Sequence, residues 1–243
     1  MTNFIKKQKR NIVWGLIILV SILVITMSVI FGIKLYQKGK YVITDFENID
    51  LTGIDSIMIV AHPDDEILWG GSHLIDGNYL VVCITAGNNP TRAEELIKAM
   101  KATGDKCIML GYPDKVLNKR SNWKYSYDDI QEDLSEILSL RQWDIIVTHN
   151  SEGEYGHSHH IKTNKIVTNV YKQNFIDDSN LYYFGEYYNK SEIEDVKGSL
   201  TAIGEENCQK KLDIIENIYL SQDFLLDKFG HTVEYENWSK YIE

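Results

Sequence analysis

The segment "SIMIVAHPDDEILWGG", residues 56–71, joins a short apolar run to a dense cluster of charged side chains. The apolar run at its start is typical of a buried strand. Asp64, Asp65 and Glu66 follow side by side, directly after His62 and Pro63. Carboxylates this close repel one another, so each must be solvated, paired or bound to a cation. The segment therefore predicts a buried strand that ends at a polar site.

Apolar runs and amphipathic stretches alternate after this segment. Strands are expected over residues 56–61, 79–86, 106–112, 144–149 and 181–187, and helices over 66–75, 92–103, 127–140, 160–172 and 205–220. Strands that are apolar throughout and alternate with helices predict a mostly parallel sheet with both faces covered. The expected fold class is therefore α/β, a Rossmann-like three-layer sandwich. In such folds ligands bind beyond the carboxyl ends of the strands.

An uncharged apolar run, "IVWGLIILVSILVITMSVIFGI", covers residues 12–33. At about 1.5 Å per helical residue, such a run spans a hydrocarbon core of roughly 30 Å. A cleaved signal peptide has a shorter apolar core and a small-residue cleavage site, whereas "KLYQKGK" follows this run. We therefore expect a transmembrane signal anchor, residues 12–33, between a cytoplasmic N-terminus, residues 1–11, and a stalk, residues 34–50.

Basic residues flank the apolar run unevenly, with four before it and three after it. The positive-inside rule then gives a weak preference for a cytoplasmic N-terminus. The remaining domain, residues 51–243, would lie outside the cytoplasm on a single-pass protein of the cell membrane. The opposite orientation, with the domain facing the cytosol, stays open.

The part of the chain after the apolar run is strongly acidic. Seven of the 25 basic residues and none of the 35 acidic residues precede Tyr41, which leaves 18 basic and 35 acidic residues and a net charge of −17. Such a surface repels nucleic acid and anionic lipid headgroups, so neither is expected as a ligand. Cys83, Cys107 and Cys208 have no C-x-x-C spacing, which argues against a disulfide scaffold or a cysteine zinc site.

A second polar cluster, "THNSEGEYGHSHH", residues 148–160, follows the fourth expected strand. Because parallel strands end at the same edge of a sheet, its histidines should meet the acidic residues 64–66 there. Imidazole and carboxylate are the ligands of zinc and other borderline divalent ions. Either cluster alone also fits a helix cap or a solvated loop. Their joint placement favours a metal site, whose cation would offset the clustered carboxylate charge.

The stretch "AHPDDEILWGGSHL" resembles the signature of the PIG-L / LmbE-type zinc N-deacetylases. That family includes deacetylases of N-acetylglucosaminyl-phosphatidylinositol and of the amino-sugar intermediates of low-molecular-weight thiols. "GEYGHSHHIKTNKIV" is similar to the family's second histidine element. Weaker similarities are found in "TAGNNPTRAEELIKAMKATG", "LGYPDK" and "KKLDIIENIYLSQ", so that the resemblance covers most of the chain after the apolar run.

The resemblance implies a role for each matched residue. His62, Asp65 and His160 would be the zinc ligands. Asp64 would be the general base that takes a proton from the attacking water. A tetrahedral intermediate needs a hydrogen-bond donor, and the leaving amine needs an acid. The resemblance implies that His157 either stabilises this oxyanion or protonates the leaving amine.

Two further residues and one departure complete the comparison with the family. Tyr155 would reach the same oxyanion or the substrate, and Arg92 would bind the substrate. His159 stands where the family usually has Asp or Asn, which puts the tuning of His157 in doubt. A residue in that position can orient neighbouring histidines.

These expectations converge on a zinc-dependent hydrolase that removes an N-acetyl group from an N-acetylglucosamine-type sugar, glycolipid or cell-envelope glycan. A metal phosphoesterase is one alternative, because clustered acids also bind Mg²⁺ or Mn²⁺. The histidine-rich second cluster favours zinc over that alternative. The second alternative is a surface module that binds glycans without catalysis. Asp64 and a complete ligand set argue against it.

Overall fold

The computed structural model describes residues 2–37, 49–174 and 180–242. Its main sheet has six strands in the order β3-β2-β1-β6-β7-β8. The first five in chain order are parallel: β1 (Ser56–Val60), β2 (Tyr79–Thr85), β3 (Lys106–Tyr112), β6 (Ile145–Thr148) and β7 (Leu181–Phe184). The edge strand β8 (Trp238–Lys240) runs antiparallel to β7. All five predicted strands and the mostly parallel sheet are confirmed.

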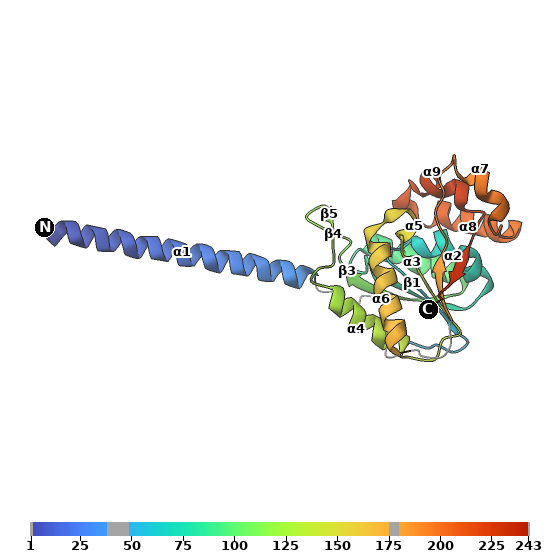
Figure 1. Ribbon diagram of the computed structural model, residues 1–243, viewed down its shortest axis with the longest axis horizontal. Coiled ribbons are helices and arrows are strands. Elements are labelled where there is room, and N and C mark those ends of the chain that lie inside the picture. The colour runs from blue at the N-terminus through green and yellow to red at the C-terminus, as the bar shows by residue number, and fades with distance from the viewer. Residues whose placement is uncertain (1, 38–48, 175–179, 243) are drawn as a thin grey trace.

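Helices cover both faces of this sheet (Figure 1). Helices α2 (Asp65–Asp76), α3 (Pro90–Thr103) and α8 (Glu205–Asn217) contribute to one hydrophobic core, and α4 (Tyr127–Leu138) and α6 (Ser158–Asn174) contribute to the other. Along β1 the side chains alternate between the two cores, because successive residues of a strand point to opposite faces. Every residue of β1 and β2 is buried. The predicted α/β three-layer architecture is therefore confirmed.

Several short elements were not predicted, since none is long enough to show a hydrophobic period. Lys115–Val116 (β4) and Lys119–Arg120 (β5) form a hairpin whose two turn residues, Leu117 and Asn118, have φ of 51° and 61°. The other short elements are α5 (Gly153–Gly156), α7 (Ile193–Val196), α9 (Leu225–Phe229) and the 3₁₀ turns Lys197–Ser199, Leu220–Gln222 and Gly230–Thr232.

The paired glycines of the opening segment allow helix α2 to approach its neighbours closely. A Cβ atom at Gly70 would lie 2.4 Å from Cε of Met58 on β1. One at Gly71 would lie 3.0 Å from Cδ of Lys211 on α8. Both contacts are tighter than packed carbon atoms tolerate. The glycines thus let the helix that carries Asp65 pack closely against strand β1 and helix α8.

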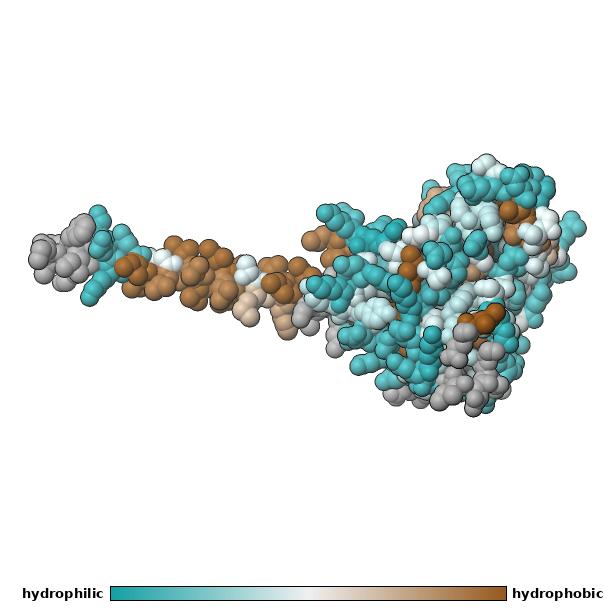
Figure 2. Space-filling view, in the orientation of Figure 1, coloured by the Kyte–Doolittle hydropathy of each residue, from teal (hydrophilic) through white to brown (hydrophobic). Residues whose placement is uncertain are grey.

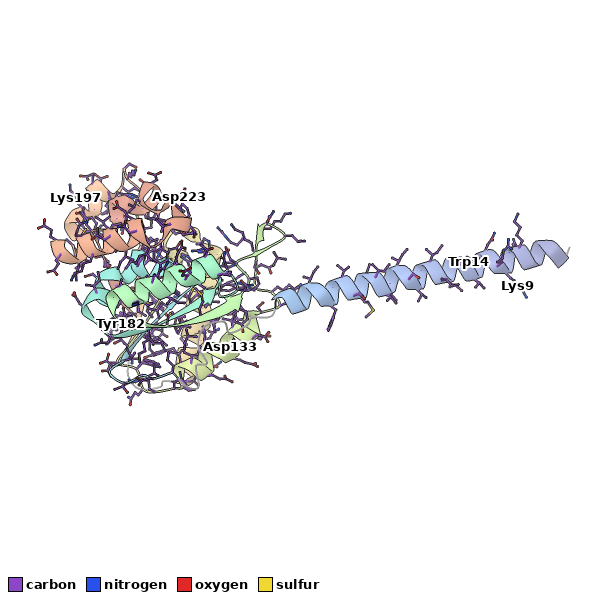
Figure 3. The ribbon with its side chains drawn as sticks, turned by 180° about the vertical axis from the view of Figure 1, so that it is seen from behind. Lys9, Trp14, Asp133, Tyr182, Lys197 and Asp223 are labelled. Atoms are coloured by element: carbon purple, nitrogen blue, oxygen red, sulfur yellow. The ribbon has the colours of Figure 1, made fainter. Side chains whose placement is uncertain are left out.

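Helix α1 (Thr2–Gln37) extends away from the folded domain, and the side chain of Trp14 projects from it freely (Figures 1 and 3). Its residues Lys7–Ile33 form the one described helix that is long and apolar enough to cross a membrane. Figure 2 shows its surface as a hydrophobic band beside a largely hydrophilic domain. By length and composition it could be a membrane anchor or a signal sequence. Most of the predicted stalk, residues 38–48, lies outside the described residues.

Candidate active site

The two polar clusters meet at one edge of the sheet, as predicted. Strands β1 and β6 are parallel neighbours, so the segments that follow them leave the sheet side by side. The order of the strands across the sheet changes direction at this point. Strands β2 and β3 lie on one side of β1, whereas β6 and β7 lie on the other. Ligand sites in open α/β sheets form at such a switch point.

Asp65 lies at the centre of the site. One carboxylate oxygen accepts a 2.8 Å hydrogen bond from the His62 backbone amide and lies 3.2 Å from Nδ1 of the same residue. Its other oxygen lies 3.2 Å from Nε2 of His160. The Asp65 side chain is 4% exposed. Although burial alone would raise the pKa of Asp65, the surrounding histidines, first among them His160, hold it well below its ordinary value.

A buried carboxylate, that of Glu154, orients two histidines. Its Oε2 atom accepts from Nδ1 of His149, at 3.0 Å, and from Nδ1 of His160. A ring that donates through Nδ1 presents the lone pair of Nε2 on its opposite side. Nε2 of His160 has no hydrogen-bond partner among the described residues, yet it faces the carboxylate of Asp65. A lone pair aimed at a carboxylate is unfavourable unless a cation lies between them.

Three groups of described side chains could hold a metal ion, each with its ligand atoms within 4.8 Å of one another. They are His62, His157 and His160; Asp65, His149 and His160; and His62, Asp114 and His159. The predicted ligands His62, Asp65 and His160 are divided between the first two groups, which share His160. The donor set and the unpartnered Nε2 atom of His160 therefore fit a divalent ion.

Asp64 and Asp65 point in different directions although they are adjacent in sequence. The Asp64 carboxylate lies 3.0 Å from Nη2 of Arg92 and lines the cavity. Burial raises the pKa of Asp64 to about 8, against the opposing effect of the Arg92 guanidinium. The backbone at Asp64 has φ of 130°, in the region that favours glycine. Strain of this kind is typical of residues held for function.

Glu66 and Tyr219 hold this strained turn in place. Oε2 of Glu66 accepts the Asp64 backbone amide at 3.0 Å, and its Oε1 accepts the Tyr219 hydroxyl. Glu66 and Tyr219 are both buried. The C-terminal "IYLSQ" segment, which resembles the family only weakly in sequence, therefore supports the turn that carries Asp64.

Arg92 contacts the protein rather than open solvent. It lies in the first turn of α3, which begins at Pro90 and whose cap residue, Asn89, accepts the Arg92 amide at 3.4 Å. Its guanidinium donates to the Pro63 carbonyl and to Asp64. A role in substrate binding stays a prediction for this residue.

His157 and Tyr155 both line the cavity. Nδ1 of His157 has no hydrogen-bond partner in the described part of the chain. Burial first, and then His62, lower the pKa of His157 to about 2, so the ring is neutral at pH 7. Burial also raises the pKa of the Tyr155 phenol, which therefore keeps its proton. Both side chains can donate a hydrogen bond without changing charge.

His159, the departure from the family pattern, is held in place by Ser121 and Trp123. Its ring stacks on Trp123 with centroids 4.2 Å apart, and its Nε2 donates to the Ser121 carbonyl at 2.7 Å. Its Nδ1 then faces Nε2 of His62 at 3.0 Å. His159 thus bears directly on a predicted metal ligand, and Ser121 and Trp123 fix which nitrogen it presents.

These side chains surround a cavity of about 230 Å³. All of the predicted site residues line it except His160, which is fully buried. The other lining residues were not assigned a role from the sequence: Leu68, Asp114, Lys115, Arg120, Gln222, Phe224, Leu225, Lys228 and Phe229. Of these, Asp114 and Gln222 had a sequence signal, since they lie in the family-like segments "LGYPDK" and "KKLDIIENIYLSQ". Glu154, which organises His149 and His160, also stood unnoticed within the second cluster.

A parallel sheet that gathers buried imidazoles and carboxylates around a cavity at its switch point is the framework of a metal-dependent α/β enzyme. The family model described as "PIG-L: GlcNAc-PI de-N-acetylase" matches residues 57–171, which include both polar clusters. The chain belongs to the PIG-L family of deacetylases, which are amide hydrolases.

Two relatives are similar in sequence. An uncharacterised protein of Acanthamoeba polyphaga mimivirus is 28% identical over 200 residues, which cover 75% of this chain and 78% of the relative. The 1D-myo-inositol 2-acetamido-2-deoxy-alpha-D-glucopyranoside deacetylase of Corynebacterium diphtheriae is 26% identical over 156 residues, 50% of this chain and 53% of that enzyme.

Two solved structures share the fold. The pseudoaglycone deacetylase of an antimicrobial reagent superposes with a TM-score of 0.53 at 16% identity, over 71% of this chain and 84% of its own. A deacetylase in complex with teicoplanin, from the biosynthesis pathway of teicoplanin, superposes with a TM-score of 0.53 at 13% identity. The superposition covers 77% of this chain and 99% of that deacetylase. Family membership favours a deacetylase over the two alternatives that the sequence left open.

Proposed function

We propose that this protein is a membrane-anchored, zinc-dependent deacetylase that removes the N-acetyl group from an N-acetylglucosamine-type sugar, either a glycolipid or a cell-envelope glycan. The observation that supports it most strongly is the Nε2 lone pair of His160, held by Glu154 and aimed at Asp65. The name of the Corynebacterium diphtheriae relative, whose substrate is an acetamido sugar on inositol, supports the sugar.

Each cavity residue has a task in this proposal. His62, Asp65 and His160 would hold the ion, which when bound polarises a carbonyl and makes water more acidic. Asp64 would take the proton of the attacking water, because the bound cation would keep its carboxylate ionised against the effect of burial. Arg92 at 3.0 Å orients that carboxylate.

The carbonyl oxygen gains negative charge as the water attacks. His157 and Tyr155 would donate hydrogen bonds to it, because both line the cavity and both keep a proton at neutral pH. The proton taken up by Asp64 is then available for the leaving amine, whose carbon–nitrogen bond breaks as the acetate forms.

Metal-dependent amine release tests this proposal. The full chain in detergent should release free amine from N-acetylglucosamine glycosides, lose that activity on treatment with a chelator, and regain it with Zn²⁺. Mg²⁺ should restore much less, because imidazole suits zinc better. Release of phosphate from a phosphomonoester without release of amine would favour the phosphoesterase alternative instead.

The anchor has its own test. We propose that residues 12–33 of α1 span the membrane once, with residues 1–11 in the cytoplasm and the catalytic domain, residues 51–243, outside it after a stalk, residues 34–50. Protease added to intact protoplasts should digest the domain and spare a tag at the N-terminus. A domain that resists protease until the membrane is permeabilised would reverse the orientation. A mature chain that starts after residue 33 would identify a cleaved signal sequence.

A further inference from the structure

One of the three groups of candidate metal ligands has no complete role in the chemistry above: His62, Asp114 and His159. These residues come from three segments, which are the turn after β1, the turn after β3 and the first turn of α6. His62 and His159 are buried, and Asp114 is partly exposed. The fold therefore gathers two imidazoles and a carboxylate beside the proposed catalytic ion, and two of the three are unused there.

Nδ1 of His159 presents a fixed lone pair. The other ring nitrogen, Nε2, donates to the Ser121 carbonyl at 2.7 Å, so Nδ1 carries no proton in the neutral ring. The ring stacks on Trp123 with the two planes 2° apart, which holds its orientation. Nδ1 then faces Nε2 of His62 at 3.0 Å. His159 is thus a buried nitrogen ligand that the sheet and the helix hold in place before any ion arrives.

His62 offers its two ring nitrogens to different neighbours. Nδ1 lies 3.2 Å from Asp65, on the side of the proposed catalytic ion. Nε2 lies 3.0 Å from Nδ1 of His159 and 3.6 Å from Oδ1 of Asp114. The two nitrogens of an imidazole can bind different partners at the same time. One ring can therefore serve the catalytic ion through Nδ1 and a second ion through Nε2.

The three ligand atoms have the spacing that an ion between them requires. Nε2 of His62, Nδ1 of His159 and Oδ1 of Asp114 lie 3.0, 3.6 and 3.7 Å apart. Ligand atoms bound at about 2.0–2.1 Å to a tetrahedral zinc ion lie roughly 3.3 Å from one another. The observed distances scatter around that value, so an ion fits between the three atoms with little side-chain movement.

The neighbouring group formed by Asp65, His149 and His160 is less suitable for a second ion. Nε2 of His149 accepts the Ala61 backbone amide at 3.0 Å, so its lone pair is already used. Nδ1 of His159 instead faces the side chains of His62 and Asp114. This contrast singles out the Asp114 group.

An ion can enter this position through the cavity, because His62 and Asp114 both line it. Lys115 and Arg120 line the same cavity and repel a cation. A second ion is therefore expected to bind more weakly than the first and to fill its site only when metal is in excess.

We propose that Nε2 of His62, Asp114 and Nδ1 of His159 form a second divalent-ion site, which zinc fills in excess and which then inhibits the enzyme. The His62 ring lies between the two ions and releases its remaining N–H proton to solvent as the second one binds. Inhibition follows because the ion occupies part of the cavity and shares a ligand with the catalytic ion. The site goes beyond the proposed deacetylase function, and its existence can be tested without turnover.

Counting metal ions tests this proposal. The full chain in detergent, stripped with a chelator and dialysed, is titrated with Zn²⁺ by calorimetry, and its zinc content is measured after gel filtration. The native chain should bind two ions, the second about tenfold or more weakly because of the cavity cations. His159→Asn and Asp114→Asn should each bind one ion fewer, since an amide is a poor zinc ligand. His231→Asn removes a histidine outside the cavity lining and, as the matched control, should keep both.

Each outcome of the count decides the question. A native chain that saturates at one ion overturns the proposal and leaves a simple hydrogen bond between Nε2 of His62 and Nδ1 of His159. Two ions in both amide variants place the second ion elsewhere and overturn it too. Loss of both ions from both variants assigns Asp114 and His159 to the first ion and rejects a second site. Retention of the first ion also shows that each variant is folded.

Amine release gives a second, separable measurement. Excess Zn²⁺ should lower the native rate severalfold relative to the rate at one equivalent. The rate of His159→Asn, compared with its own value at one equivalent, should fall much less. Equal inhibition of the two proteins would overturn the inhibitory role. If no amine is ever released, the deacetylase function fails, whereas the ion count still decides whether the second site exists.

Discussion

Replacing Asp64 with asparagine is expected to slow deacetylation by about a hundredfold or more, the usual contribution of a general base, while the protein keeps its metal. The structure separates the Asp64 carboxylate from the histidine cluster and turns it toward Arg92, 3.0 Å away. Asparagine has the same shape but cannot take up a proton at neutral pH. His157→Ala should give the same result, because the proposed role of His157 concerns the substrate oxygen.

Asp65→Asn should instead lose both metal and activity. The Asp65 carboxylate contacts His62, His149 and His160, and each of the three candidate metal groups contains Asp65 or a residue that it contacts. An amide is a poor ligand for zinc and offers less charge to the surrounding imidazoles. The two neighbouring aspartates should therefore be distinguishable by one pair of measurements.

Those measurements are zinc content per chain and the rate of amine release, made on the same preparations. Asp128→Asn, an exposed change in the first turn of α4, is the control and should match the native protein in both. Loss of metal from Asp64→Asn together with its retention in Asp65→Asn would reverse the assignment. Full activity in Asp64→Asn would move the general base to another carboxylate, with Glu66 the first candidate because it contacts the Asp64 amide.

Lys211→Met is expected to destabilise the folded domain by about 3–5 kcal/mol, the usual cost of leaving one partner of a buried ion pair alone. Nζ of Lys211 lies 2.8 Å from Oε1 of Glu236, and both side chains are 0% exposed. The same carboxylate accepts the Ser72 amide and lies against His73. This pair fastens α2, which carries Asp65, to α8 and to the C-terminal segment.

Urea unfolding of native and variant chains in the same detergent measures this effect. Lys210→Met is the matched control, because Lys210 pairs with exposed Glu206 and should change stability by less than about 1 kcal/mol. The double variant Lys211→Met/Glu236→Leu should recover part of the loss, since it leaves no buried charge. Equal stability of Lys211→Met and the native chain would show that this pair contributes nothing.

The pair also predicts how stability depends on pH. Burial alone would raise the pKa of Glu236, but Lys211 and His73 lower it from 4.5 to about 2. A carboxyl group with a lower pKa in the folded state stabilises the protein above its unfolded pKa. That contribution should be complete above about pH 5 and should decrease as the pH falls toward 2. In Lys211→Met this part of the acid dependence should be much smaller.

The sequence by itself determined the architecture of this protein and the place of its site. Five strands and five helices were readable because each is long enough to show a continuous apolar run or a helical period. The two polar clusters follow strands, so the geometry of a parallel sheet brings them to one edge without further information. The apolar length of residues 12–33 likewise predicted a long N-terminal helix.

The tertiary structure alone decided what each polar side chain contacts. It turns Asp64 to Arg92 and Asp65 to the histidines, places Glu154 behind His149 and His160, and brings Arg120 and Lys228 to one cavity. These contacts depend on turns, on a hairpin and on helices of four or five residues, which have no hydrophobic period to read. Periodicity records which face of an element is buried, whereas the direction of a side chain at a turn is set by packing between segments distant in the sequence.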